Sequence, residues 1–283
     1  MKYACSLEIG DVKAYGQLAR DAEDAGWDAV FVADAIGIET KDYPAFDWYD
    51  PWIALAVMAE HTEHIRLGTM IAAVPRRRPW KLAREVLTLD HISNGRMILG
   101  AGLGAATDDG GFYKVGEPMD LKVRGELLDE GLQIIDGLWT GKPVKFSGKH
   151  YTVEDMTMLP VPVQKPRVPI WVVGVWPREK SMLRAVAWDG IVPQKYNGSP
   201  MDRPTPEHIK AISDYAKVHR EPDTEFDIIV GGSTAGKSRE AIAAEVHPFE
   251  EAGATWWWEM MVWDARDAKT LSERIRKGPP RID

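Results

Sequence analysis

Apolar residues fall along this chain in short continuous runs that alternate with longer segments of helical spacing. The run at residues 3–9 predicts a strand, and Asp11 is of a residue type that caps helices. The apolar positions within residues 15–22 lie on one face of that helix, and Gly26 suits its end. A second apolar run at residues 27–33 predicts a buried strand. These segments make one strand–helix–strand unit.

The same unit recurs through the rest of the sequence. Further strands are predicted at residues 65–71, 97–101, 169–174, 188–193, 226–231 and 254–259. Further helices are predicted at residues 79–95, 123–141, 179–187, 206–219, 239–252 and 267–277. Eight strands alternating with helices favour an α/β fold, the (β/α)8 or TIM barrel, as one domain over residues 1–283. Insertions are expected in the strand-to-helix loops and, at the proline-rich residues 142–167, before the fifth strand.

Composition excludes several classes of protein. The chain has 283 residues, a formal net charge of −8 and one cysteine, Cys5, so an intramolecular disulfide is ruled out. The acidic balance is a poor match for nucleic acid or an anionic membrane. The uncharged runs fall short of the ~18 apolar residues of a membrane span, and a strand-like segment takes the place of a signal peptide, so we expect a cytoplasmic protein. The seven histidines lie on predicted helices or away from the barrel rim, so no metal site is predicted.

Carboxylates stand where the chemistry of such a barrel is found, at the carboxyl ends of strands. Glu8 ends the first predicted strand, Asp34 follows the second and Glu259 ends the eighth. A partly desolvated carboxylate can have a raised pKa and move protons, so Glu8 and Glu259 are candidate catalytic acids or bases. The alternative for each is a hydrogen-bonded or ion-paired structural carboxylate.

Tryptophan is unusually abundant, with 12 residues, several of them in predicted rim segments. Trp48 is one of these, and three more form a consecutive run. Because side chains alternate along a strand, Trp256 and Trp258 are expected to share one face and Trp257 to take the other. Trp48, Trp256 and Trp258 are therefore candidates to line an apolar substrate pocket, with core packing as the alternative.

Two glycine-rich motifs imitate nucleotide-binding sequences. Residues 231–238 fit the phosphate-loop pattern, but the sequence beyond the helix that this loop opens holds one strand and one helix, too little for a nucleotide hydrolase core. A polar strand-to-helix turn is the favoured interpretation. Residues 100–105 fit the dinucleotide pattern, but no helix can start directly after them. Gly102 and Gly104 instead allow the backbone to approach a large, flat ligand.

A set of longer stretches resembles the bacterial-luciferase-like monooxygenase superfamily. They are residues 65–71, 77–85, 88–100, 116–118, 124–130, 138–141, 148–151, 160–166 and 169–174. The similarity runs to about residue 195 and returns weakly at 251–255. Members are (β/α)8 barrels that bind reduced FMN or the deazaflavin coenzyme F420 at the strand C-termini. The resemblance implies oxygen insertion or hydride transfer on a small molecule, a homodimer, and a separate flavin or F420 reductase as a possible partner.

The resemblance also assigns roles to residues of this sequence. It implies that Met70 and Ile71 form a bulge behind the ring, which in deazaflavin members contains a non-proline cis peptide, and that Asp34 lies near the ring's polar edge. Further implied cofactor contacts are Gly102, Leu103 and Gly104 beside the ring, and Gly174, Val175, Trp176 and Arg178 near its phosphate. Residues 76–78 suit an anionic partner, although a solvated run of charge is the favoured interpretation.

One position departs from the family pattern. Deazaflavin-dependent sugar dehydrogenases and luciferase carry histidine directly after the aspartate, and this chain has Ala35. The usual imidazole base is therefore absent, which argues against sugar oxidation through it. The sequence predicts an FMN- or F420-dependent oxidoreductase with an unknown apolar substrate. It leaves open the cofactor, the choice between oxygen insertion and hydride transfer, and a non-catalytic flavin-binding barrel; the nucleotide hydrolase is disfavoured.

Overall fold

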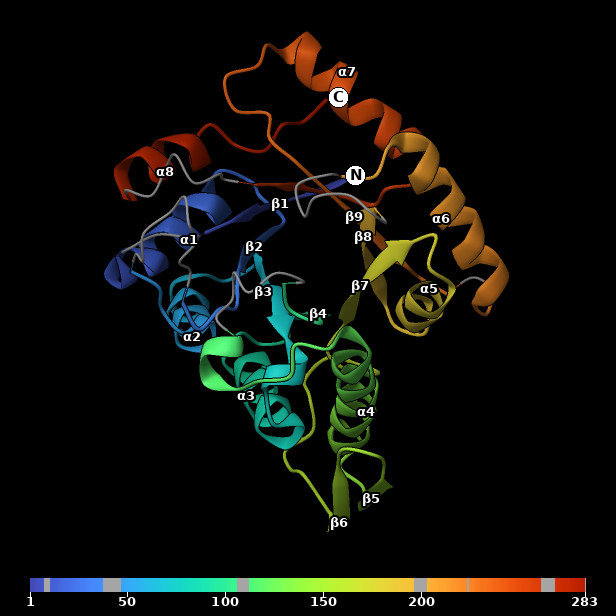
Figure 1. Ribbon diagram of the computed structural model, residues 1–283. Coiled ribbons are helices and arrows are strands. Elements are labelled where there is room, and N and C mark those ends of the chain that lie inside the picture. The colour runs from blue at the N-terminus through green and yellow to red at the C-terminus, as the bar shows by residue number, and fades with distance from the viewer. Residues whose placement is uncertain are drawn as a thin grey trace.

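The computed structural model describes residues 1–7, 11–37, 47–105, 112–195, 203–222, 224–260 and 268–282. Within these residues, eight parallel strands close into a barrel in the order β1-β2-β3-β4-β7-β8-β9-β10 (Figure 1). The strands are β1 (Lys2–Ser6), β2 (Ala29–Val32), β3 (Arg66–Ala73), β4 (Met97–Gly102), β7 (Ile170–Trp176), β8 (Gly190–Lys195), β9 (Asp227–Gly232) and β10 (Trp256–Glu259). The predicted (β/α)8 fold is confirmed.

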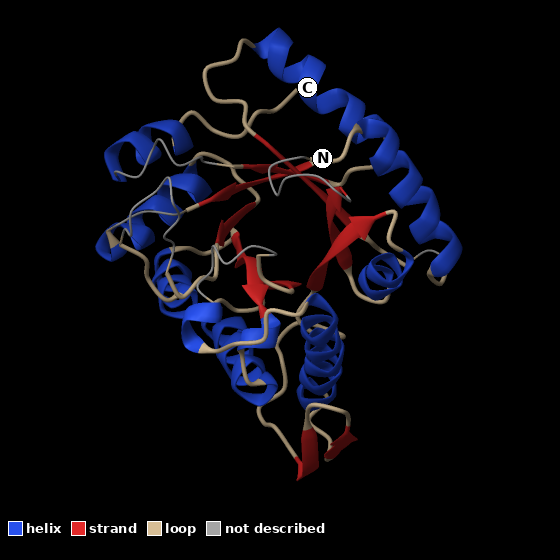
Figure 2. Cartoon of the chain, viewed as in Figure 1, coloured by secondary structure: helices blue, strands red, loops and turns tan. Residues whose placement is uncertain are grey.

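Helices surround the strands on the outside of the barrel (Figure 2). They are α1 (Tyr15–Asp24), α2 (Pro51–His61), α3 (Pro79–Ile92), α4 (Leu121–Trp139), α5 (Glu179–Val186), α6 (Pro206–His219), α7 (Arg239–Glu251) and α8 (Ala268–Ile275). The expected excursion before the fifth barrel strand contains an antiparallel hairpin of β5 (Val144–Ser147) and β6 (Thr152–Met156), beyond α4 in Figure 1. No helix in the described part of the chain is long and apolar enough to cross a membrane.

The pattern of apolar residues predicts no range for α2. Its start carries a clear signal, because the Asp50 side chain accepts hydrogen bonds from the backbone N–H groups of Trp52 and Ile53, and Pro51 occupies the first turn. The rest of the helix carries no such sequence signal, because apolar residues fall on nearly all of its sides. The apolar stripe by which the other helices were recognised is therefore missing here.

Side-chain alternation divides the core into two parts. The larger part lies between the strands and the helices. The smaller part fills the barrel itself with Ala4, Ala29, Phe31, Met70, Ile98, Trp171, Val192, Ile229 and Trp256. Trp171 is central to it, with its ring centroid 5.6 Å from that of Phe31 and 5.1 Å from that of Trp256. The barrel is therefore a packed core that closes the mouth from below.

Strand β3 is irregular where it reaches the mouth. Its register with β4 shifts between Thr69 and Ala72, and a non-proline cis peptide joins Met70 to Ile71, as the resemblance implied. Both of these side chains pack with the barrel interior, which regular alternation does not allow for consecutive residues. The bulge therefore adds one inward-facing side chain at the top of the barrel.

Candidate active site

Three partly exposed apolar side chains lie on top of the barrel core. They are Ile71, Val173 and Trp258, which follow Met70, Trp171 and Trp256 toward the carboxyl ends of their strands. They form what we call the mouth floor. Because chemistry in this fold takes place at the carboxyl ends of the strands, the mouth floor is where a ligand would be seated.

Two glycines keep the mouth floor flat. A Cβ added to Gly102 would lie 2.3 Å from Ile71 Cδ1 and 3.1 Å from Val173 Cγ2. A Cβ added to Gly231 would lie 3.1 Å from Trp258 Cε3. The absence of these two side chains lets Ile71 and Val173 extend over β4 and the Trp258 indole over β9. Met70, Ile71 and Gly102 are thus brought together, as the sequence analysis expected.

The polar side chains that the described strands direct to this level of the barrel are few and neutral. Ser6 shares the inward face of Ala4, and Gln194 shares that of Val192 and is exposed. The Nε1 atom of Trp258 is shielded from water and has no hydrogen-bond acceptor among the described residues. Sequence reasoning missed Ser6, Val173, Gln194 and Gly231, although alternation from the buried residues two positions earlier would have found them.

Asp34 does not face the mouth. Its side chain has no exposed surface, and its carboxylate accepts hydrogen bonds from Arg77 Nε (2.8 Å), Arg77 Nη2 (2.7 Å), Arg76 Nη2 and the backbone N–H of Ala73 (3.2 Å). Because both carboxylate oxygens accept hydrogen bonds from the protein, Asp34 has no free surface for the edge of a cofactor ring. The expectation of a direct cofactor contact is corrected: Asp34 ties the segment after β2 to the segment after β3.

The same cluster corrects the interpretation of residues 76–78 as a solvated run. The side chains of Arg76 and Arg77 keep only 11% and 16% of their exposure, whereas Arg78 is exposed. The Arg77 guanidinium also lies over the Trp52 ring, 5.2 Å from its centroid. Although burial opposes charge on Arg77, its pKa is raised because Asp34 stabilises the guanidinium.

The segment after β4 is held from two sides. Gly104 has a φ of +82°, and an added Cβ would lie 2.6 Å from the Phe112 ring. That ring lies between two guanidinium groups, 5.8 Å from Arg76 and 4.1 Å from Arg124. Arg124 is fully buried and donates to the backbone oxygen of Ala105 at 2.7 Å. These contacts fix the backbone that leaves β4 close to the mouth.

The remaining residue of this segment, Leu103, packs against the core between strands and helices. Its side chain therefore faces away from the mouth floor. Any contact of Leu103 with a ligand in the mouth would be made by its backbone.

The carboxyl end of β7 mainly packs against the neighbouring helices. A Cβ on Gly174 would lie 2.4 Å from Ile191 Cδ1 and 3.2 Å from Ala185 Cβ, so this glycine lets α5 approach the barrel closely. The backbone N–H of Val175 donates to Ser181 Oγ at 2.9 Å. The Trp176 ring meets Tyr215 edge-on at 6.1 Å.

The start of α5 carries both signs of charge. Arg178 stands at the N-cap position and is exposed. Glu179 lies in the first helical turn. A carboxylate there weakens the attraction of this helix terminus for a phosphate, whereas the positive charge of Arg178 strengthens it.

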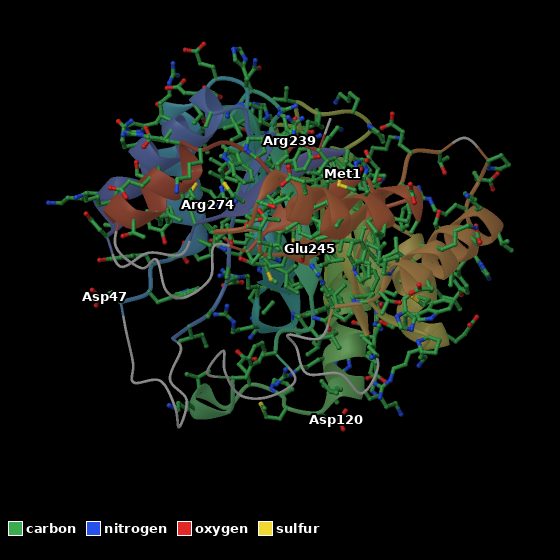
Figure 3. All side chains as sticks on the ribbon, turned by 90° about the horizontal axis from the view of Figure 1, so that it is seen from above. Met1, Asp47, Asp120, Arg239, Glu245 and Arg274 are labelled. Carbon is green, nitrogen blue, oxygen red and sulfur yellow. The ribbon has the colours of Figure 1, made fainter. Side chains whose placement is uncertain are left out.

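Glu259 lies on the other side of β10 from the mouth. It is 1% exposed and accepts hydrogen bonds from Thr234 N (2.7 Å), Thr234 Oγ1 (3.0 Å), Trp257 Nε1 (2.9 Å) and Arg274 Nη2 (3.1 Å). It therefore shares the helix-facing side with Trp257, and Arg274 reaches it from α8 (Figure 3). The expectation that Glu259 is a catalytic acid or base is wrong, because strand alternation places it away from the mouth.

The candidate tryptophans separate in the same way. Trp256 is fully buried inside the barrel, where its Nε1 donates to Asp227 Oδ1 at 2.9 Å, so its assignment to the substrate pocket is corrected to the core. Trp258 lies on the mouth floor, on the face that it shares with Trp256, as alternation predicted. Trp48 is partly exposed in the segment that leads into α2. Glu8 lies outside the described residues.

The phosphate-loop motif has its cation engaged elsewhere. Lys237 Nζ pairs with the carboxylate of Glu245 on α7, the residue labelled in Figure 3, and this carboxylate also pairs with Arg203 Nη2 at 2.6 Å. Ser238 caps α7 through its side chain, which accepts from Ala241 N at 3.3 Å. The segment is a capped strand-to-helix turn, and Gly236 in it has a φ of +75°. Among the described residues, no three histidine, cysteine, aspartate or glutamate side chains gather as metal ligands.

The model of the luciferase-like monooxygenase family matches residues 5–278. The chain belongs to this family. The oxygenase component of the flavin-dependent trigonelline monooxygenase of Acinetobacter baylyi is 31% identical over 158 residues, which is 56% of this chain and 42% of that protein. The F420-dependent glucose-6-phosphate dehydrogenase of Microbacterium testaceum is 30% identical over 168 residues, which is 59% of this chain and 48% of that protein.

The fold is shared over the whole chain with a solved structure. An F420-dependent secondary alcohol dehydrogenase, solved with an F420-acetone adduct, superposes with a TM-score of 0.78, at 19% identity and with 100% of both chains covered. This likeness concerns the fold. The alignments with the two curated relatives span about half of their length or less.

Proposed function

We propose that this protein is an oxidoreductase that holds reduced FMN or coenzyme F420 over the mouth floor and acts on a small, largely apolar molecule. The observation that carries the proposal is the apolar surface of Ile71, Val173 and Trp258 at the carboxyl end of the barrel, over which Gly102 and Gly231 carry no side chains. Membership of the luciferase-like monooxygenase family supports it, as do the flavin- and F420-dependent relatives.

The residues present fit a tricyclic ring. Gly102 leaves the floor without a side chain over β4, and a Cβ there would take up the space into which Ile71 and Val173 extend. Met70 and Ile71 would support the ring from below, and the backbone of Leu103 and Gly104 would lie beside it. Arg178, with the backbone of residues 174–176, would face the phosphate end. When bound, FMN or F420 supplies the redox chemistry, as oxygen insertion or hydride transfer.

The protein's own part is to exclude water and to hold the surrounding segments in place. The packed barrel core closes the mouth from below, and the Asp34 ion pairs join two of the segments that border it. Because Ala35 replaces the family histidine and Glu259 faces the helices, Glu8 stays the proposed acid or base. Trp48 and Trp258 stay the proposed substrate contacts. As the resemblance implies, we extend the proposal to a homodimer, served by a separate reductase if the cofactor is FMN.

A titration of tryptophan fluorescence with FMN and with F420, side by side, tests the proposal. We expect one cofactor to bind at least about tenfold more tightly, which corresponds to about 1.4 kcal/mol and identifies the reaction class. Gly102→Ala should weaken that binding, because its Cβ would drive the Ile71 methyl toward the ring. Gly137→Ala on α4 is the matched control, since its Cβ would make only ordinary contacts of 3.5 Å. Binding of neither cofactor would refute the proposal.

A non-catalytic flavin-binding barrel is the second candidate. It is favoured by one observation: the described side chains facing the mouth beside the mouth floor, Ser6 and Gln194, are not titratable. Rapid mixing of the protein and its reduced cofactor with oxygen, or with a panel of carbonyl substrates, distinguishes the two. Oxidation of the cofactor no faster than in free solution would favour the binding protein.

A further inference from the structure

The three consecutive tryptophans of β10 differ in what their indole N–H groups bind. Trp256 Nε1 donates to Asp227 Oδ1 and Trp257 Nε1 to Glu259 Oε2, each at 2.9 Å. Trp258 Nε1 is equally shielded from water but has no acceptor among the described residues. A buried donor without a partner is costly, and such groups in native proteins call for an explanation. An acceptor supplied by a ligand would be one.

The position of Trp258 separates it from another indole of this kind. Trp171 Nε1 also lacks an acceptor in the described part of the chain, but its ring is fully enclosed between Phe31 and Trp256. Trp258 lies one layer higher, on the mouth floor, and part of its side chain is exposed. A ligand seated on the floor would therefore contact the Trp258 ring but not Trp171, and its oxygen would reach Nε1 by displacing the contacts that shield this atom.

The surroundings of Trp258 select the ligand's chemistry. Ile71 and Val173 are apolar, and the polar side chains that the described strands direct to this level, Ser6 and Gln194, are uncharged. A charged ligand would lose hydration here, and these described side chains offer it no counter-charge, which is unfavourable. A neutral indole donor beside an apolar surface instead matches a neutral oxygen.

We infer that Trp258 Nε1 donates a hydrogen bond to the oxygen of an uncharged carbonyl compound, or of its alcohol, as the substrate of this site. The inference rests on the proposed function, since the cofactor would share the mouth floor. It assigns Trp258 as the residue that selects for an oxygen acceptor, and it makes the substrate class neutral and otherwise apolar.

The test uses pairs of probes that differ only in the acceptor. Acetophenone and cyclohexanone are titrated against α-methylstyrene and methylenecyclohexane, in which a CH2 group replaces the oxygen. The protein is labelled with 15N at its indoles, and the Trp258 resonance is the one absent from Trp258→Phe. We expect both ketones to shift this resonance downfield to saturation, and the matched alkenes to leave it nearly unmoved at equal occupancy.

Two variants measure how much the Trp258 hydrogen bond contributes to the affinity for ketones. Trp258→Phe keeps an aromatic ring but removes the donor, and should weaken ketone binding about fivefold while alkene binding changes less than about twofold. Trp257→Phe is the control, because it removes an indole N–H that already has an acceptor within the protein. If Trp258→Phe does not fold, Trp258→Tyr identifies the resonance instead, and the comparison of ketone and alkene in the wild-type protein still tests the inference.

Three results would overturn the inference. The ketone and its matched alkene could shift the Trp258 resonance equally, or Trp258→Phe could weaken the binding of both equally. Benzoate could also bind as tightly as acetophenone. Each titration is made with and without the cofactor. A protein that binds ketones through Trp258 but binds neither FMN nor F420 would refute the proposed function and retain the inference. Binding of a cofactor, together with a Trp258 resonance that does not shift on addition of the ketones, would refute the inference and retain the proposed function.

Discussion

Replacing Asp34 by asparagine tests whether this residue joins two segments of the barrel rim or contacts a cofactor. The carboxylate is fully buried and pairs with both Arg76 and Arg77, which keep 11% and 16% of their side-chain exposure. An amide in its place can still accept through one oxygen, but its NH2 group meets guanidinium donors and its charge is gone.

The expected loss of stability follows from these contacts. Removing one partner of a buried ion pair costs about 3–5 kcal/mol. Because the two guanidinium groups retain some contact with water, we expect the lower end, about 3 kcal/mol in the free energy of unfolding. For a domain of this size, that corresponds to a fall in Tm of roughly 6–12 °C.

Denaturant unfolding of wild type and Asp34→Asn, with cofactor titrations of both, measures this prediction. Asp214→Asn on α6 is the control, because Asp214 pairs on the surface with Lys210 and should cost less than about 0.5 kcal/mol. A loss below about 1 kcal/mol in Asp34→Asn would refute the ion-pair reasoning. Weaker cofactor binding at unchanged stability would also refute the ion-pair reasoning, and would indicate that Asp34 contacts the cofactor ring.

Three further changes separate structural from functional roles. Glu259→Gln should lower the free energy of unfolding by about 2–4 kcal/mol while turnover per folded molecule is unchanged; slower turnover at full stability would contradict its placement facing the helices. Gly104→Ala should cost about 1 kcal/mol more than Gly236→Ala, because both have positive φ but only the first would press on an aromatic ring, and equal unfolding free energies would argue against this crowding. Lys149 and a neighbouring histidine lower the pKa of the Glu126 carboxyl from 4.5 to about 2, so its stabilisation is present above pH 4.5 and lost as the pH falls toward 2. Glu126→Gln should therefore flatten this part of the plot of Tm against pH, and an unaltered acid limb would show that the ion pair contributes nothing.

Local pattern was sufficient for most elements of the fold. Seven helices and the barrel strands follow from stripes and short apolar runs, with boundary shifts such as the sixth strand, predicted at 188–193 and found at Gly190–Lys195. The helix α2 escaped, because residues 51–61 are apolar on nearly all sides and leave no stripe. Its capping aspartate, Asp50, and the proline after it were the available signal.

The candidate site was predicted less completely than the fold. The alternation that correctly set Trp256 and Trp258 apart from Trp257 also implies that Glu259 faces the helices, so this error could have been avoided. The ion pairs of Asp34 could not have been foreseen in the same way. Its partners Arg76 and Arg77 stand 42 and 43 residues away, and the local pattern made them look solvated.

The order of residues along the chain was enough to predict the repeating strand–helix unit and the barrel, the inward or outward side of each regular strand position, and the family resemblance. These depend on the spacing of residues close together along the chain, which fixes local hydrogen bonding and which face is apolar. Which polar groups found partners depended on contacts made in three dimensions: Asp34 and Glu259 are satisfied within the protein, whereas the Trp258 N–H has no acceptor in the described part of the chain. Closing the barrel brings together residues that are remote in sequence, and the burial and pairing of each side chain follow from those neighbours.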